Sequence, residues 1–222
     1  MSTTAADLRD LLAALGHAVV TSGLVVGSGG NLSARQPDSD ECWVTASGTW
    51  LDRLARSSFV RVRLADGAVV NATAPLHGTE LPPTSELALH LATYRARPDV
   101  NVIVHLHPQT VLLLDALGEP VRLATTDHAY YLRRVVTAPF RLPGTAELGE
   151  VAAVAAANGT NCVILSRHGC SILAETVELA HKRALYLEEA ATMTYRALVL
   201  GRTLPECPAE MFSALGDFNS TV

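Results

Sequence analysis

The sequence has few aromatic residues and no excess of basic ones, and each shortage excludes a class of protein. Aromatic side chains make up 5% of the 222 residues, and 17 Lys and Arg are outnumbered by 22 Asp and Glu, which gives a formal net charge of −5. Without a basic stripe to neutralise phosphates, we expect no nucleic-acid partner. A small anionic ligand is still allowed, because backbone amides or a metal ion can hold one locally.

Cysteine is also scarce, and the four cysteines form no C-x-x-C pair: they are Cys42, Cys162, Cys170 and Cys207. The first three lie in or beside apolar runs, as buried free thiols do. Acidic residues interrupt the N-terminal region at Asp7 and Asp10, and the uncharged stretches are too short or too polar to span a bilayer. We therefore expect no membrane association and a reducing cytoplasmic location.

What is present is a sizeable core, since 49% of the residues are hydrophobic. Periodicity predicts helices over 5–20 with Thr4 as N-cap, and over 109–117, 145–157 and 177–201. Residues 82–86 mark the start of another helix that runs to about 95, with a hydroxyl residue as its cap and Glu86 in its first turn. It predicts strands over 42–46, 59–64, 69–73, 100–107, 133–139, 162–166 and 171–174. With no linker or repeat, this pattern indicates one α/β domain over 1–222, in which the tail 202–222 can be flexible.

His105 and His107 form the most informative pattern. Strand side chains alternate between faces, so the two imidazoles leave the same face of Val102–His107. An H-x-H pair on a strand needs one or two further ligands to complete a metal site. His168 follows an apolar strand and precedes Gly169, and Glu86 begins the helix that leads to the H-x-H strand. Three histidines and a carboxylate suit zinc and tolerate manganese or cobalt. The alternative is that these histidines are hydrogen-bonded residues of the core.

Five short motifs follow one another along the chain: Gly27-Ser28-Gly29-Gly30-Asn31-Leu32-Ser33, Thr45-Ala46-Ser47-Gly48, Pro83-Thr84-Ser85-Glu86, His105-Leu106-His107 and His168-Gly169. In this order and at these separations they resemble the class II aldolase/adducin-head family, over residues 5 to about 200. The resemblance implies a single three-layer α/β domain with a central, mainly antiparallel sheet flanked by helices. It also implies a homotetramer with fourfold symmetry and sites at the subunit interfaces.

The resemblance implies a role for each motif residue. His105, His107 and His168 would be zinc ligands, and Glu86 would be the acid/base and can also bind the metal. The substrate phosphate would be bound by Ser28, Gly29, Asn31, Ser47, Gly48, Thr84 and Ser85. The residue types agree with this, since glycines permit a backbone nest and hydroxyls donate to phosphate without positive side chains. An ordinary turn and a plain helix cap are the alternative interpretations.

A tyrosine from the neighbouring subunit commonly completes the site in the family that this sequence resembles. Tyr130 and Tyr131 are the two candidates, and the sequence does not choose between them. Their surroundings, Asp127-His128-Ala129-Tyr130-Tyr131, depart from the pattern expected of a fuculose-phosphate aldolase, so the aldehyde half of the substrate can differ. A tyrosine pair that only packs at an interface is the alternative.

Three functions remain open. The first is a zinc-dependent aldolase that cleaves a ketose phosphate like L-fuculose 1-phosphate to dihydroxyacetone phosphate and an aldehyde through a metal-stabilised enediolate. The second keeps the fold and metal but is a decarboxylase, a dehydratase or a 4-epimerase acting on a sugar acid or sugar phosphate. The third is a scaffold like the adducin head, without catalysis, for which three converging imidazoles would have no use.

Overall fold

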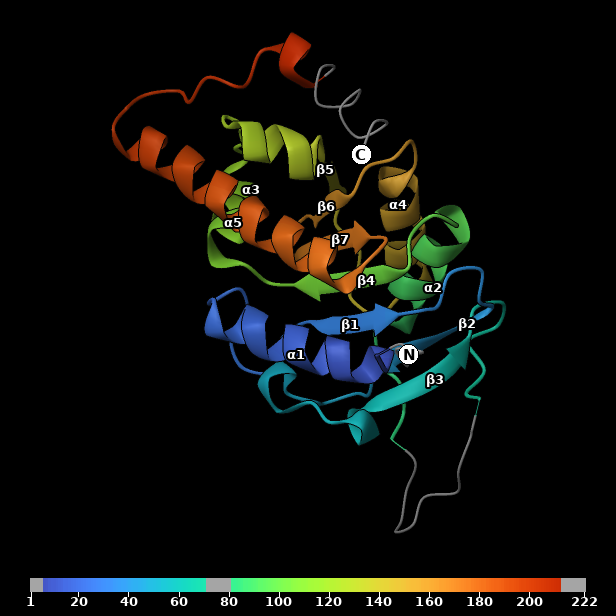
Figure 1. The fold of residues 1–222 in the computed structure, drawn as a ribbon. Coiled ribbons are helices and arrows are strands. Elements are labelled where there is room, and N and C mark those ends of the chain that lie inside the picture. The colour runs from blue at the N-terminus through green and yellow to red at the C-terminus, as the bar shows by residue number, and fades with distance from the viewer. Residues whose placement is uncertain (1–5, 71–80, 213–222) are drawn as a thin grey trace, which may run out of the picture.

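A seven-stranded sheet lies at the centre of the computed structural model, which describes residues 6–70 and 81–212 (Figure 1). Its strands are β1 (Asn31–Ala34), β2 (Glu41–Thr45), β3 (Phe59–Arg63), β4 (Val102–Leu106), β5 (Val135–Ala138), β6 (Cys162–Leu165) and β7 (Gly169–Ala174). The spatial order is β3-β2-β1-β4-β7-β6-β5, and all neighbours are antiparallel except β5 and β6. The expected mainly antiparallel α/β fold is confirmed.

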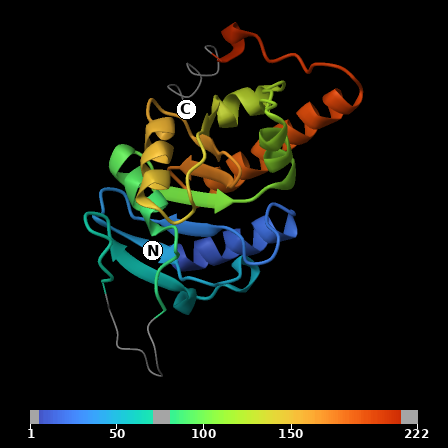
Figure 2. The same ribbon diagram turned by 180° about the vertical axis from the view of Figure 1, so that it is seen from behind.

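Helices cover both faces of the sheet. They are α1 (Leu8–Thr21), α2 (Leu87–Ala96), α3 (Gln109–Leu117), α4 (Ala146–Ala156) and α5 (Val177–Val199). Figure 1 shows α1 and α5 in front of the sheet, and Figure 2, from behind, shows α2 and α4 on the other face. No helix in the described part of the chain is long and apolar enough to cross a membrane.

The alternation of side chains along β4 explains the two layers. Val102, Val104 and Leu106 belong to the apolar cluster under α1, α3 and α5, and Ile103 belongs to the second cluster under α2 and α4. His105 alternates with Leu106 and therefore points to the α2 side. His105 thus lies on the central strand, on the face of the sheet that α2 covers.

Two expected helix starts are wrong in detail. Helix α1 begins at Leu8, and its N-cap is Asp7, whose carboxylate accepts the Arg9 N–H at 2.9 Å, so Thr4 is not the cap. Helix α2 begins at Leu87, with Glu86 at the N-cap position and no side-chain cap. The hydroxyl of Thr84 accepts the backbone N–H of Glu86 at 3.3 Å instead. An anchored Glu86 backbone is the result.

Some strands also differ from the expectation. Strand β1 was not predicted, β7 begins at Gly169 rather than 171, and β4 ends at Leu106, one residue before His107. Val69 forms an isolated bridge with Val62, while 71–73, the rest of the expected returning strand, lie outside the described residues. A π-helical turn, η3 (His128–Leu132), and two short 3₁₀ turns, η1 (Leu51–Arg53) and η2 (Arg56–Ser58), were also not predicted.

Candidate active site

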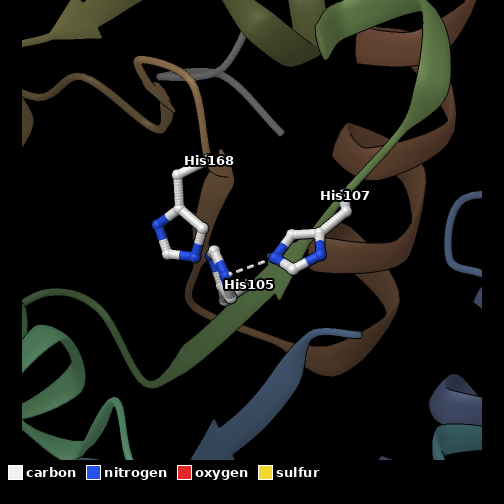
Figure 3. A group of neighbouring side chains, drawn as sticks. All are labelled: His105, His107 and His168. Carbon is white, nitrogen blue, oxygen red and sulfur yellow. Dashed lines mark hydrogen bonds between the residues drawn. The ribbon is translucent and has the colours of Figure 1, made fainter. Parts of the chain in front are cut away.

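Three imidazoles from two segments of the sheet meet at one point. His105 lies in β4, His107 directly follows it, and His168 lies in the turn between β6 and β7. Because β7 pairs with β4 and places Cys170 opposite Leu106, the residue before β7 returns to the end of β4. One ligand atom from each of the three rings lies within 4.8 Å of the others (Figure 3). Sequence alternation on a strand and the topology of the sheet together assemble this trio.

The Nδ1 nitrogen of His105 fixes the orientation of this ring. Its Nδ1 lies 3.0 Å from the carbonyl oxygen of Cys170, so Nδ1–H donates there and Nε2 is the nitrogen that faces His107 and Glu86. His105 Nε2 is 3.0 Å from His107 Nε2. Burial lowers the pKa of His107 to about 4 and also lowers the pKa of His168. Burial thus favours the neutral form of His107 and His168, which is the form that binds a metal.

Glu86 completes the group. Its Oε2 lies 3.1 Å from His105 Nε2, and its Oε1 lies 3.2 Å from His168 Nε2. Burial raises the pKa of Glu86, but interaction with His105 and the Asn31 amide outweighs burial and lowers the pKa to about 2. A carboxylate thus faces the imidazole nitrogens.

This set of donor atoms fits a divalent cation. Lone pairs of imidazole and carboxylate oxygens converge, and neither Glu86 Oε1 nor His168 Nδ1 has a hydrogen-bond partner in the described part of the chain. Nitrogens that share a tetrahedral zinc at its usual bond length lie roughly 3.3 Å apart, close to the 3.0 Å between His105 and His107. The backbone carbonyl on His105 Nδ1 is the kind of outer partner that metal-binding histidines have.

Two glycines leave room for the imidazoles. A Cβ on Gly169 would lie 2.6 Å from His107 Cδ2 and 2.9 Å from His105 Cε1, and a Cβ on Gly29 would lie 2.9 Å from His107 Nδ1. Contacts this short are not tolerated without displacement of the neighbour. Both glycines come from the expected motifs, and their place in the site is steric as well as conformational.

A polar pocket of about 280 Å³ opens over the trio. All seven residues expected to bind phosphate line it, together with Glu86, His107 and His168: they are Ser28, Gly29, Asn31, Ser47, Gly48, Thr84 and Ser85. Pro143, Thr45 and Thr49 also line it and were missed, because no motif contains Pro143 or Thr49 and Thr45 was read as a strand residue. Among the described residues no Lys or Arg lines the pocket, so hydroxyls and backbone amides are its donors for an anion.

Tyr130 and Tyr131 lie elsewhere in the chain. Both are in η3 and line a separate pocket with Arg133 and Arg183. Tyr131 stacks on Tyr186 of α5, with ring centroids 4.7 Å apart. Within one chain the structure therefore does not bring either tyrosine to the histidines, and a catalytic role for them would require an adjacent copy.

A sheet of this order that carries three imidazoles beside a carboxylate defines an α/β protein equipped for metal-assisted acid/base chemistry. Comparison with known proteins narrows this class to one family. A family model described as Class II Aldolase and Adducin N-terminal domain matches residues 10–195, and the chain belongs to this family.

Individual relatives differ in the reaction that their names give. The chain is 30% identical to the L-fuculose phosphate aldolase of Methanocaldococcus jannaschii. The alignment spans 176 residues and covers 79% of this chain and 89% of the relative. It is 28% identical to the 3-oxo-tetronate 4-phosphate decarboxylase of Haemophilus influenzae, with 84% and 86% covered. A solved L-fuculose 1-phosphate aldolase superposes with a TM-score of 0.86 at 27% identity, and 98% of each chain is covered. The protein is thus an enzyme of this family.

Proposed function

We propose that the protein is a zinc-dependent aldolase that reversibly cleaves a ketose phosphate similar to L-fuculose 1-phosphate into dihydroxyacetone phosphate and an aldehyde. The observation that carries the proposal is the position of Glu86, a carboxylate within 3.2 Å of two imidazole nitrogens at the floor of a hydroxyl-lined pocket. The aldolase names of relatives such as that of M. jannaschii support the same reaction.

The metal would be held by His105, His107 and His168, with Glu86 able to join them before substrate binds. Bound there, a divalent cation such as zinc, manganese or cobalt would supply Lewis-acid stabilisation of the negative charge that develops on the substrate oxygens. Zinc fits best, because neutral imidazoles in a four-coordinate arrangement are its common ligands.

Glu86 would move the proton at carbon. When the carbon–carbon bond breaks, its electron pair stays on the carbon beside the ketone, and the hydroxyl on the leaving carbon loses its proton and becomes the aldehyde. Glu86 returns a proton to the carbon in this direction and removes it in the reverse direction. The lowered pKa keeps the resting carboxylate ionised, which is the form that removes the proton in the reverse direction; in the cleavage direction Glu86 first takes up a proton from solvent and then gives it to the carbon. Tyr130 or Tyr131 from a neighbouring subunit would act on the hydroxyl proton at the aldehyde oxygen.

The substrate phosphate would bind among the hydroxyls that line the pocket. Ser28, Ser47 and Ser85 offer hydroxyl donors, and glycines near Ser28 and Ser47 open the backbone for amide donors. Thr84 is already engaged with the Glu86 N–H, and one amide N–H of Asn31 is committed to Glu86. These two residues therefore position Glu86 as well as line the phosphate site.

Decarboxylation of a 3-oxo acid phosphate is the second candidate. The similarity to the H. influenzae decarboxylase supports it, and the same imidazoles and pocket would serve, since charge again develops beside a carbonyl. A dehydratase or 4-epimerase would use the same groups. The fate of the departing carbon, as aldehyde or as carbon dioxide, separates these reactions.

A substrate panel tests the proposal. Zinc-loaded protein is incubated with L-fuculose 1-phosphate, L-ribulose 5-phosphate, a 3-oxo-tetronate 4-phosphate and the unphosphorylated counterpart of each. We expect release of dihydroxyacetone phosphate from the first compound and no cleavage of free L-fuculose to dihydroxyacetone. Carbon dioxide from the oxo acid alone would replace the aldolase with the decarboxylase. Turnover of unphosphorylated compounds only would refute the phosphate site.

A further inference from the structure

A buried row of polar side chains begins at Glu86 and runs away from the pocket. Asn31 Nδ2 donates to Glu86 Oε2 at 2.8 Å, and Asn31 Oδ1 lies 2.5 Å from His90 Nε2. On its other side, His90 Nδ1 lies 2.7 Å from Ser33 Oγ, which lies 2.9 Å from the Tyr94 hydroxyl. His90 and Ser33 are fully buried. The reaction proposed above gives no role to His90, Ser33 or Tyr94.

The row arises from a match between two periodicities. Glu86, His90 and Tyr94 are four residues apart on α2, where four residues advance about 6 Å. Asn31 and Ser33 are two residues apart on β1, where two residues advance about 6.6 Å. One face of the helix therefore lies in step with one face of the strand, and polar groups alternate between the two elements.

Every hydrogen bond in the row has one direction. Glu86 is ionised and can only accept, so the Asn31 amide must present its nitrogen to Glu86 and its oxygen to His90. His90 must then carry its proton on Nε2 and donate to Asn31. Burial lowers the pKa of His90 to about 3, so the ring is neutral and Nδ1 accepts from the Ser33 hydroxyl. If the amide were flipped, Asn31 Oδ1 would face Glu86 Oε2, and neither oxygen can donate a hydrogen bond.

The far end of the row is fixed to the protein. Because Ser33 donates its proton to His90, the Tyr94 hydroxyl donates to Ser33, and the guanidinium of Arg35 lies over the Tyr94 ring, 4.9 Å from its centroid. Arg35 in turn donates to the carbonyl oxygens of Val100 and Pro98 at 2.9 and 2.6 Å. Neither end of the row is thus free to rotate.

We propose that His90 is a positioning residue for the reaction: its Nε2–H holds Asn31 Oδ1, which keeps Asn31 Nδ2 directed at Glu86 and the carboxylate aimed at the reacting carbon. This role rests on the acid/base function proposed for Glu86. In the described part of the chain His90 hydrogen-bonds to Asn31 and Ser33 and to none of the three imidazoles, so we expect its loss to act on proton transfer rather than on metal binding.

Two substitutions of similar polarity separate this role from simple core packing. In His90→Gln, the side-chain amide nitrogen can occupy the place of Nε2 and still donate to Asn31. In His90→Asn, the shorter side chain reaches only toward Ser33 and leaves Asn31 Oδ1 without its donor. We expect kcat of His90→Asn to fall about 10- to 100-fold at little changed KM, and His90→Gln to recover most of the loss. Both should retain wild-type metal content. Equal kcat in the two variants would overturn the proposal.

Two measurements without substrate keep the role testable if the reaction is misassigned or a variant folds poorly. Crystal structures of the zinc-loaded variants should show the Asn31 amide and Glu86 displaced in His90→Asn and in place in His90→Gln. Nitrogen-15 spectra of the wild-type histidines should place the His90 proton on Nε2. An unmoved Glu86 in His90→Asn, or a proton on Nδ1, would refute positioning. If the substrate panel fails while the crystal structures and the spectra both give the expected results, only the aldolase reaction is refuted and the positioning role stands.

Discussion

At the scale of single residues, the metal trio depends most on His105. It is fully buried and donates through Nδ1 to Cys170, and its Nε2 lies within 3.1 Å of both His107 and Glu86. Truncation removes a ligand and leaves the carboxylate without its nearest imidazole.

We therefore expect His105→Ala to lose most of its metal. Purified wild-type protein should contain roughly one zinc ion per chain by metal analysis, and the variant much less. His17→Ala is the matched control, because His17 is exposed on α1 and far along the chain from the trio. Undiminished metal in His105→Ala would reject the ligand assignment.

Sequence alone located the three histidines and Glu86, but not His90. The trio could be predicted because strand alternation places His105 and His107 on one face, whatever surrounds them. His90 lies in an apolar helix, where a lone histidine gives no signal of a partner. Its significance depends on Asn31 and Ser33, whose strand was not predicted. A contact between helix and strand 55 or more residues apart is a property of the fold and not of a local pattern.

At the scale of elements, the pairing of β7 beside the end of β4 is as important as the ligands themselves. Gly169 lies where a Cβ would meet the Leu106 carbonyl oxygen at 2.5 Å and the imidazoles of His105 and His107 at under 3 Å. Its neighbour His168 is in the trio, so any shift of this turn moves a ligand. Close approach of the two strands is thus a condition for the metal site.

Gly169→Ala should separate the strands and weaken metal binding. We expect a loss of about 1–3 kcal/mol in the free energy of unfolding and a lower zinc content at limiting metal. The control is Gly159→Ala, which imposes a positive φ of 77° on alanine but whose Cβ meets nothing within 4 Å. That control should lose stability and keep its metal. The prediction fails if both variants bind zinc equally.

The start of α1 gives a dependence on pH. Hydrogen bonds from Arg9 lower the pKa of Asp7 from 3.8 to about 2. A carboxyl group with a lowered folded pKa stabilises the fold above its unfolded pKa and loses that effect as the pH falls toward the folded value. Asp7→Ala should cost about 1 kcal/mol at pH 7 by urea unfolding, and Asp7→Asn, which keeps a capping oxygen, less. The gap between wild type and Asp7→Asn should narrow below about pH 4. A gap that widens there would contradict the assignment.

The elements that escaped prediction have a common cause. Strand β1 is four residues long and buried throughout, so the polar–apolar alternation of Asn31, Leu32, Ser33 and Ala34 is too short to stand out from the glycine-rich loop before it. Its two polar residues face α2. The π-helical turn depends on how 128–132 pack on α5, where Tyr131 stacks on Tyr186. The long helices and β4 were found because their periodicity is strong within a single segment.

At the scale of the whole molecule, the separation of Glu86 from the tyrosines predicts a shared site. Glu86→Gln should keep its metal and lose turnover, and the active one of Tyr130→Phe and Tyr131→Phe should also lose turnover. If neighbouring copies complete each other's sites, a ring assembled from equal amounts of the two inactive variants should regain activity. About a quarter of its sites would combine an intact Glu86 from one copy with an intact tyrosine from the next. The measurement is turnover after joint refolding, with each variant refolded alone as control. Mixtures that stay inactive would exclude a tyrosine donated by a neighbour.

The site joins parts of the chain that are far apart in sequence: Asn31 on β1, Glu86 before α2, His105 on β4 and His168 beyond β6. A metal ion bound there links the central strands, so it cannot stay bound to one part of the domain while the rest unfolds. Ligation stabilises only the assembled state, and the gain grows with the logarithm of free metal over its dissociation constant. The concentration of free metal around the protein would therefore govern the lifetime of the folded domain as well as its rate of turnover.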